Sequence, residues 1–101
     1  MAMADIIAER ALEHDGQPNR PVTVRIYRPE QRPAGEWECR FEVLGLQPLS
    51  YAAIGEDSVQ ALFGALRLAG MELERYKGRI SWLGHKPWEP VGFHDLADMK
   101  L

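Results

Sequence analysis

The stretch that most constrains the fold runs from Asp57 to Tyr76 and reads DSVQALFGALRLAGMELERY. Its apolar residues recur at steps of three and four, a spacing that places them on one stripe of an α-helix. Asp57 stands where its side chain can cap the first turn, and Gln60 three residues later completes a capping-box pattern. The sequence therefore predicts a helix over residues 57–76 whose core-facing stripe is Val59, Leu62, Phe63, Leu66, Gly70 and Leu73.

The far side of this helix is also apolar, since it holds Ala61, Gly64, Leu68 and Met71. A helix that is apolar around most of its circumference is usually covered on two sides. Gly64 and Gly70 each cost about 1 kcal/mol relative to alanine inside a helix. Two readings stay open for these glycines: another segment approaches the helix closely, or the glycines are tolerated.

Two strands are clear from alternating hydrophobicity on either side of a loop. Residues 21–28 direct Val22, Val24 and Ile26 to one face, and residues 37–44 direct Trp37, Cys39, Phe41 and Val43 to one face. The intervening residues 29–35 contain two prolines and a glycine and predict a loop. Residues 50–54 predict a short further strand, and residues 79–83 a short extended segment.

The opening segment, residues 4–14, is ambiguous. Its Ala, Glu, Arg and Leu residues favour a helix. A turn cluster at Asp15-Gly16 followed by an alternating strand instead calls for a hairpin partner upstream. We favour the strand, because the sheet needs it. The predicted fold is then α+β, an antiparallel sheet of four to five strands packed on one main helix (57–76).

Length and composition indicate a single domain over residues 1–101, with 15 acidic and 12 basic residues and a net charge of −3. This charge argues against a surface dedicated to phosphate neutralisation. The lone Cys39 cannot form an internal disulfide, and no apolar run approaches the roughly 20 residues that a membrane span needs. We expect a cytoplasmic protein with no signal peptide and no membrane association.

Residues that carry chemistry are sparse, so the sequence predicts no catalytic, cofactor-binding or metal-binding site. Cys39 lies on the inward face of its strand and is interpreted as a small buried hydrophobe. One alternative is a small enzyme using a cluster of His85, His94 and Asp95 on a folded tail. Another is weak nucleic-acid binding through Arg25, Arg28 and Arg40, although interleaved glutamates would cancel most of that field.

The strand WECRFEVLGL, the helix start DSVQAL at residues 57–62 and SWLG at residues 81–84 resemble a family of small uncharacterised bacterial domains. The resemblance covers roughly Ile6 to Leu83. It implies an antiparallel sheet with one helix, and it carries no catalytic residue to transfer.

The functional hypothesis rests on an excess of apolar residues. Residues 85–101 form a tail with prolines and aromatic side chains, which we expect to pack on the helix or on a neighbouring molecule. Because one sheet and one helix do not need all of these side chains for a core, we expect a non-enzymatic interaction module that forms a homodimer or binds another protein. Its expected surface comprises Leu68, Met71, Trp88 and Phe93.

Overall fold

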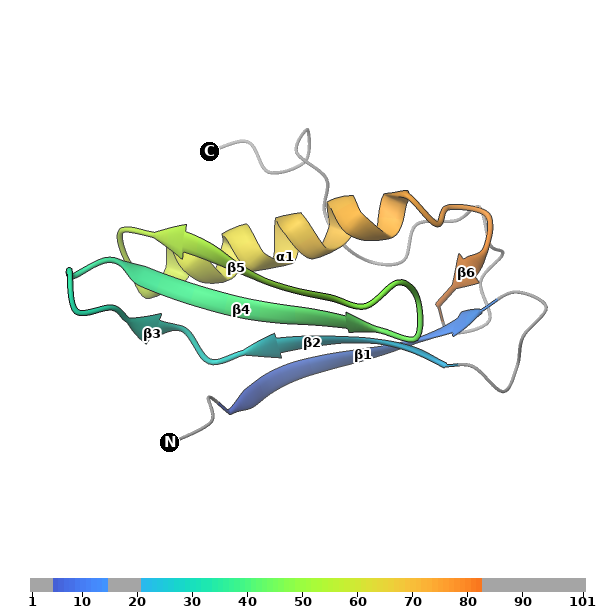
Figure 1. The fold of residues 1–101 in the computed structure, drawn as a ribbon, viewed down its shortest axis with the longest axis horizontal. Helices are drawn as coiled ribbons and strands as arrows, with labels where there is room; N and C mark the ends of the chain where they lie inside the picture. Colours follow the sequence, from blue (N-terminus) through green and yellow to red (C-terminus); the bar gives the residue numbers. More distant parts are fainter. Residues whose placement is uncertain (1–4, 15–20, 83–101) are drawn as a thin grey trace.

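The protein is an antiparallel sheet with one helix packed on one of its faces (Figure 1). The structure, a computed structural model, describes residues 5–14 and 21–82. The predicted α+β fold with a single main helix is confirmed. In chain order the elements are β1 (Ile6–His14), β2 (Val22–Tyr27), β3 (Glu30–Gln31), β4 (Trp37–Leu44), β5 (Leu49–Gly55), α1 (Ser58–Glu74) and β6 (Ile80–Ser81).

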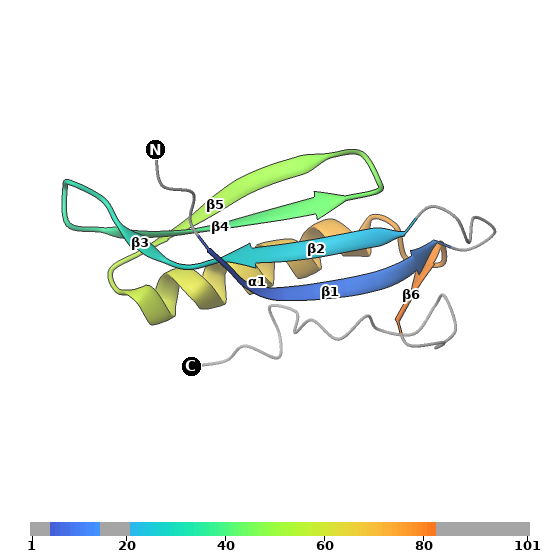
Figure 2. The ribbon, with the colours of Figure 1, turned by 90° about the horizontal axis from the view of Figure 1, so that it is seen from below.

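The sheet has six strands in the described part of the chain, and β4 lies at its centre. β4 pairs with β2 and β3 on one side and with β5 on the other, while β1 pairs with the far side of β2. β6 pairs with the last two residues of β1, with Glu13 opposite Ser81 and His14 opposite Ile80 (Figure 2). The two long strands at the edges of the sheet are therefore β1 and β5.

The helix-facing side of the sheet agrees with the predicted alternation. Val24 and Ile26 of β2 lie opposite Val43 and Phe41 of β4, and both, like Val22, are almost fully buried. Ile80 and Leu12 close the core at the β6 end of the sheet. The prediction of a buried β4 face is confirmed for Cys39, Phe41 and Val43, and Trp37 is partly buried.

The face that α1 presents to the sheet was predicted only in part: Leu73 is buried, and Leu62 and Leu66 pack against the core. Val59 and Phe63 are 58% and 49% exposed, whereas Ala61, assigned to the far side, is fully buried. The residues that are buried on α1 are Ala61, Ala65, Ala69 and Leu73. The reason is the closeness of the packing: small side chains let the helix backbone approach β5, and the larger apolar residues are displaced to the flanks.

Gly64 shows how close this approach is. A methyl group added there would lie 2.9 Å from Cβ of Ala53 in β5, closer than side-chain carbons normally come. Of the two readings left open for the helix glycines, close approach therefore applies to Gly64.

The N-terminus of α1 forms largely as predicted. The Asp57 side chain accepts a 2.7 Å hydrogen bond from the backbone N–H of Gln60, which is the expected cap. The Gln60 side chain accepts a 2.6 Å hydrogen bond from the N–H of Glu56, one residue before the cap. The helix ends at Glu74, two residues before the predicted Tyr76, and the turn that follows contains Gly78 with a positive φ of 89°.

Residues 6–14 form a strand, so the choice of strand over helix is confirmed. A bulge interrupts its pairing with β2 between Ile6 and Ala8. β3 lies inside the predicted 29–35 loop, where Glu30 and Gln31 pair with the start of β4. β6 is a shorter form of the segment predicted at residues 79–83.

The turn from β4 to β5 depends on Gly45, which has a φ of 94°. A side chain there would collide with the carbonyl oxygen of Pro21 at the start of β2. Glycine lets the chain reverse directly beside the core strand.

Candidate interaction surface

The open edge of β5 is the most unusual surface of the described structure. Among the residues that the structure describes, β5 pairs with β4 alone. An edge strand directs alternate N–H and C=O groups away from its neighbour, where another strand can pair with them. The seven residues of β5, LSYAAIG, carry no charged side chain and no proline. β5 therefore lacks the side chains that usually block strand addition at an edge.

β5 also exposes an apolar side chain on each face of the sheet. Tyr51 lies opposite Phe41 on the helix side and is 59% exposed, with the two ring centroids 6.4 Å apart. Ile54 lies opposite Glu38 on the open side and is 49% exposed. A strand added beside β5 would cover both side chains.

One flank of α1 lies over this edge. Gly64, Leu68 and Met71 follow one another at steps of four and three residues, so they share a flank of the helix. The contact between position 64 and Ala53 places that flank above β5. Leu68 is partly buried against the core, whereas Met71 is 45% exposed. We call β5 together with Gly64, Leu68 and Met71 the β5 surface.

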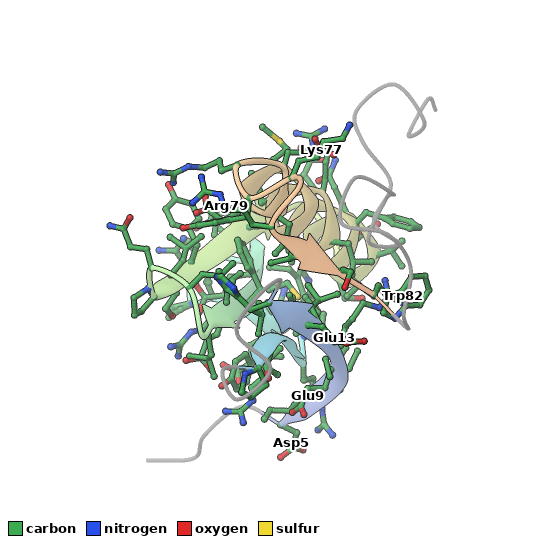
Figure 3. The ribbon with its side chains drawn as sticks, turned by 90° about the vertical axis from the view of Figure 1, so that its right-hand side faces the viewer. Asp5, Glu9, Glu13, Lys77, Arg79 and Trp82 are labelled. Carbon is green, nitrogen blue, oxygen red and sulfur yellow. The ribbon has the colours of Figure 1, made fainter. Side chains whose placement is uncertain are left out.

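The opposite edge of the sheet is built differently. β1 contains the bulge near Ile7 and carries Glu9, Arg10 and Glu13. Figure 3 shows Asp5 just before β1 and Glu9 and Glu13 within it, away from Lys77 and Arg79 in the turn that follows α1. The Arg10 guanidinium lies 4.0 Å from the centre of the Trp82 ring. Bulges and charged side chains are the features with which proteins prevent strand addition, so β1 is a protected edge.

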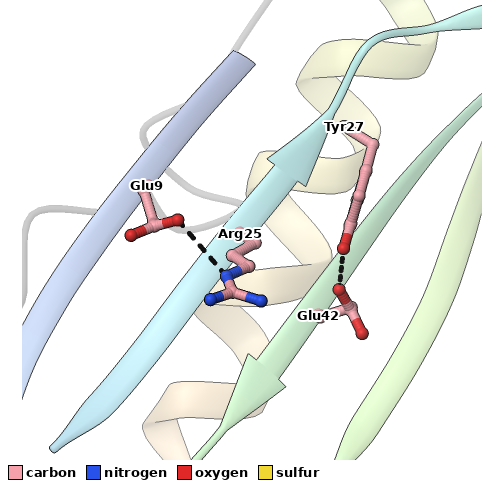
Figure 4. Close-up of polar contacts among 4 residues, drawn as sticks. All are labelled: Glu9, Arg25, Tyr27 and Glu42. Atoms are coloured by element: carbon pink, nitrogen blue, oxygen red, sulfur yellow. Dashed lines mark hydrogen bonds and ion pairs between the residues drawn. The ribbon is translucent and has the colours of Figure 1, made fainter. Parts of the chain in front are cut away.

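The open face of the sheet consists of paired polar side chains. Arg25 Nε donates to Glu9 Oε2 at 3.2 Å, and the Tyr27 hydroxyl donates to Glu42 Oε1 (Figure 4). The hydrogen bond to Glu42 is the main cause that raises the pKa of Tyr27, and partial burial is the second. Since each of these groups has a nearby partner, the face resembles an ordinary solvated sheet surface.

The arginines proposed for nucleic-acid binding lie on or beside this face. Arg28 forms a 2.8 Å ion pair with Asp5, and the Arg40 guanidinium lies 5.9 Å from the centre of the Tyr27 ring. Arg25 and Arg28 thus each have a carboxylate within contact distance, which weakens the case for phosphate binding.

Cys39 is a buried thiol, as predicted. Its Sγ donates to the carbonyl oxygen of Tyr27 at 3.2 Å, and burial raises its pKa to about 11. At neutral pH the thiol is protonated and shielded, so it is a poor nucleophile.

Several of the predicted site residues cannot be placed. Trp88 and Phe93, like the His85, His94 and Asp95 cluster, lie outside the described residues. In residues 5–14 and 21–82, no three histidine, cysteine or acidic side chains come together in a group that could hold a metal ion.

The profile of a family described as "Domain of unknown function (DUF6968)" matches residues 8–94, which is most of the chain. The chain belongs to this family. The match extends past β6, whereas the resemblance seen in the sequence ended near Leu83. No curated protein and no solved structure shows a significant match. Within the part of the chain that the structure describes, no helix has the length and hydrophobicity needed to cross a membrane.

Sequence reasoning singled out Leu68 and Met71 and predicted a strand at residues 50–54, but it did not include that strand, β5, in the interaction surface. LSYAAIG is visible in the sequence as an uncharged segment, yet whether a strand lies at the edge of a sheet depends on which strands pair.

Proposed function

We propose that this member of the DUF6968 family is a protein-interaction module of the bacterial cytoplasm, not an enzyme, and that the β5 surface is its binding site. The observation that carries the proposal is the uncharged edge of β5 with exposed Tyr51 and Ile54. Proteins that add a strand to such an edge gain main-chain hydrogen bonds and bury the side chains on both faces.

The flank of α1 adds a second layer to this site. A partner strand beside β5 would extend the sheet, and anything attached to that strand on the helix side would meet Met71 and the edge of Tyr51. The site thus combines directional main-chain pairing with an apolar contact, which together can give both affinity and specificity. Trp88 and Phe93 remain candidates for the same surface.

Site-specific photo-crosslinking tests the proposal. We expect p-benzoylphenylalanine at Tyr51 or Met71 to give a defined protein adduct when cells producing the full chain are irradiated. Ile6, which is 44% exposed on the protected edge β1, provides the matched control position and should give little adduct. Mass spectrometry of the adducts identifies the partner. Equal labelling at the three positions, or no adduct at positions 51 and 71, would show that the β5 surface is not a binding site.

A further inference from the structure

We infer that the partner of the β5 surface is a second copy of this chain, bound by antiparallel pairing of β5 with β5 about a twofold axis at Ala52. This inference rests on the proposed function and adds the identity of the partner and the register. Three independent features of the structure support it.

The first feature is the difference between the two edges. Pairing β5 of one copy with β1 of the next would use two different surfaces and would generate an open chain of molecules. The bulge and the charged residues of β1 oppose that arrangement. Pairing β5 with itself uses one surface twice and closes at two copies. The edge that is open for pairing is thus the one that gives a closed dimer.

The second feature is the self-complementarity of the β5 sequence. Ala52 is the middle residue of Leu49–Gly55, so a twofold axis there pairs the whole strand. Tyr51 then lies opposite Ala53, Ile54 opposite Ser50, and Leu49 opposite Gly55. Each large side chain meets a small one across the interface, and no two like charges meet.

The third feature is the position of α1. The helix contacts β4 and β5 about equally and β2 only slightly, so its axis runs between β4 and β5. Because neighbouring strands are about 4.8 Å apart, the helix axis is displaced about 2.4 Å from β5 toward β4. The twofold axis would then place two antiparallel helices about 10 Å apart, and packed helices are about 8–10 Å apart. Their facing flanks are those of Gly64, Leu68 and Met71, so strand pairing and helix packing occur together.

A charge pair at the twofold axis tests this arrangement. Ala52 of one copy lies beside Ala52 of the other, so Ala52→Lys would place two ammonium groups next to each other. Ala52→Glu would in the same way place two carboxylates next to each other. We expect the wild-type chain to sediment at twice its 11.5 kDa mass and each variant alone to have its dimer affinity reduced at least tenfold. An equimolar mixture of the two variants should restore the dimer, because lysine then faces glutamate.

Two controls separate the interface from folding. Ala11→Lys introduces the same charge at an exposed position on β1 and should leave the dimer intact. Ala52→Glu places a carboxylate opposite Arg40 within its own sheet, so its fold should persist by circular dichroism. Loss of the dimer in that variant therefore reports on the interface.

The outcomes distinguish this inference from the proposed function. A wild-type chain that stays monomeric at millimolar concentration, or a dimer unaffected by Ala52→Lys, overturns the β5–β5 arrangement. If positions 51 and 71 then crosslink to a different protein, the interaction module stands with another partner. If they crosslink to nothing, both proposals fail. Restoration of the dimer by the mixed Lys and Glu variants, with the Ala11→Lys control unaffected, supports the pairing at Ala52.

Discussion

Cys39 shows how one buried residue links the open face of the sheet to the core. Its side chain is fully buried between β4 and the helix layer, and its thiol donates to the carbonyl oxygen of Tyr27 in β2. Phe41, two residues further along β4, is buried on the same face of the sheet. On the other face, the Tyr27 hydroxyl is bonded to Glu42. Backbone and side chain of Tyr27 thus connect β2 to β4 on both faces of the sheet.

The raised pKa of Cys39 predicts a loss of stability at alkaline pH. The pKa is about 11 in the folded protein and 9.0 for an ordinary thiol, so the unfolded chain loses its proton first. The corresponding stabilisation is complete below pH 9 and is lost as the pH rises to 11. At about 1.4 kcal/mol per pKa unit it amounts to about 3 kcal/mol. Urea unfolding from pH 8 to 11 measures it.

The matched variant is Cys39→Ala, which retains Tyr27 and the other groups that titrate in this range. We expect Cys39→Ala to be less stable than wild type at pH 8 and to lose less stability between pH 9 and 11. Unfolding free energies that fall in parallel for the two proteins would show that the thiol ionises as easily in the folded chain as in the unfolded one.

At the scale of elements, alternating hydrophobicity predicted the buried faces of the strands well, but the apolar stripe of the helix predicted only part of its buried face. β2 and β4 have one buried and one solvated face, so side chains at every second position report the burial directly. On α1 the hydrophobic stripe correctly included Leu73, but the centre of the contact with the sheet is made by Ala61, Ala65 and Ala69, which a hydrophobicity pattern weights weakly. Ala53 and Gly55 on β5 leave room for that close contact. The buried face of α1 therefore depends on the side chains of β5 as well as on the sequence of the helix.

The remaining elements depend on pairing across the sheet. β1 has the composition of a helix and becomes a strand because β2 offers a free edge beside it. β3 has two residues, too few to show alternating hydrophobicity, and it forms a strand because it pairs with the start of β4. The β5 surface was only half predicted for the same reason: Leu68 and Met71 are visible in the sequence, while the open edge is a property of the assembled sheet.

Two substitutions on α1 distinguish the observed face from the predicted one. Ala65 is fully buried, so Ala65→Leu should overpack the contact with the sheet and cost about 1–3 kcal/mol. Phe63 is half exposed, so Phe63→Ala should cost less than the roughly 3–5 kcal/mol typical of a core phenylalanine. Thermal and urea unfolding give both values. A larger cost for Phe63→Ala than for Ala65→Leu would mean that the predicted stripe faces the core after all.

At the scale of the whole molecule, the core is concentrated under α1 and at the β6 end of the sheet. The helix contacts β4, β5 and, slightly, β2. β1 has a single buried side chain, Leu12, near its C-terminal end, while Ile6, Ile7 and Ala8 are exposed. Little apolar burial thus stabilises the first half of β1, which is attached mainly through its ladder with β2 and through the Arg25–Glu9 ion pair.

This uneven burial predicts an order of local opening. Segments with few buried contacts open at lower free energy than the central strands. We expect the amides of residues 6–10 that pair with β2 to exchange with deuterium at least about 100-fold faster than those of β2 that pair with β4. Exchange followed by NMR resolves the individual amides. Glu9→Gln, which weakens the ion pair to Arg25, should accelerate exchange in β1 and leave β4 unchanged. If β1 exchanges as slowly as β2, it opens only when the whole sheet unfolds, and its stability then comes from contacts beyond those of the described residues.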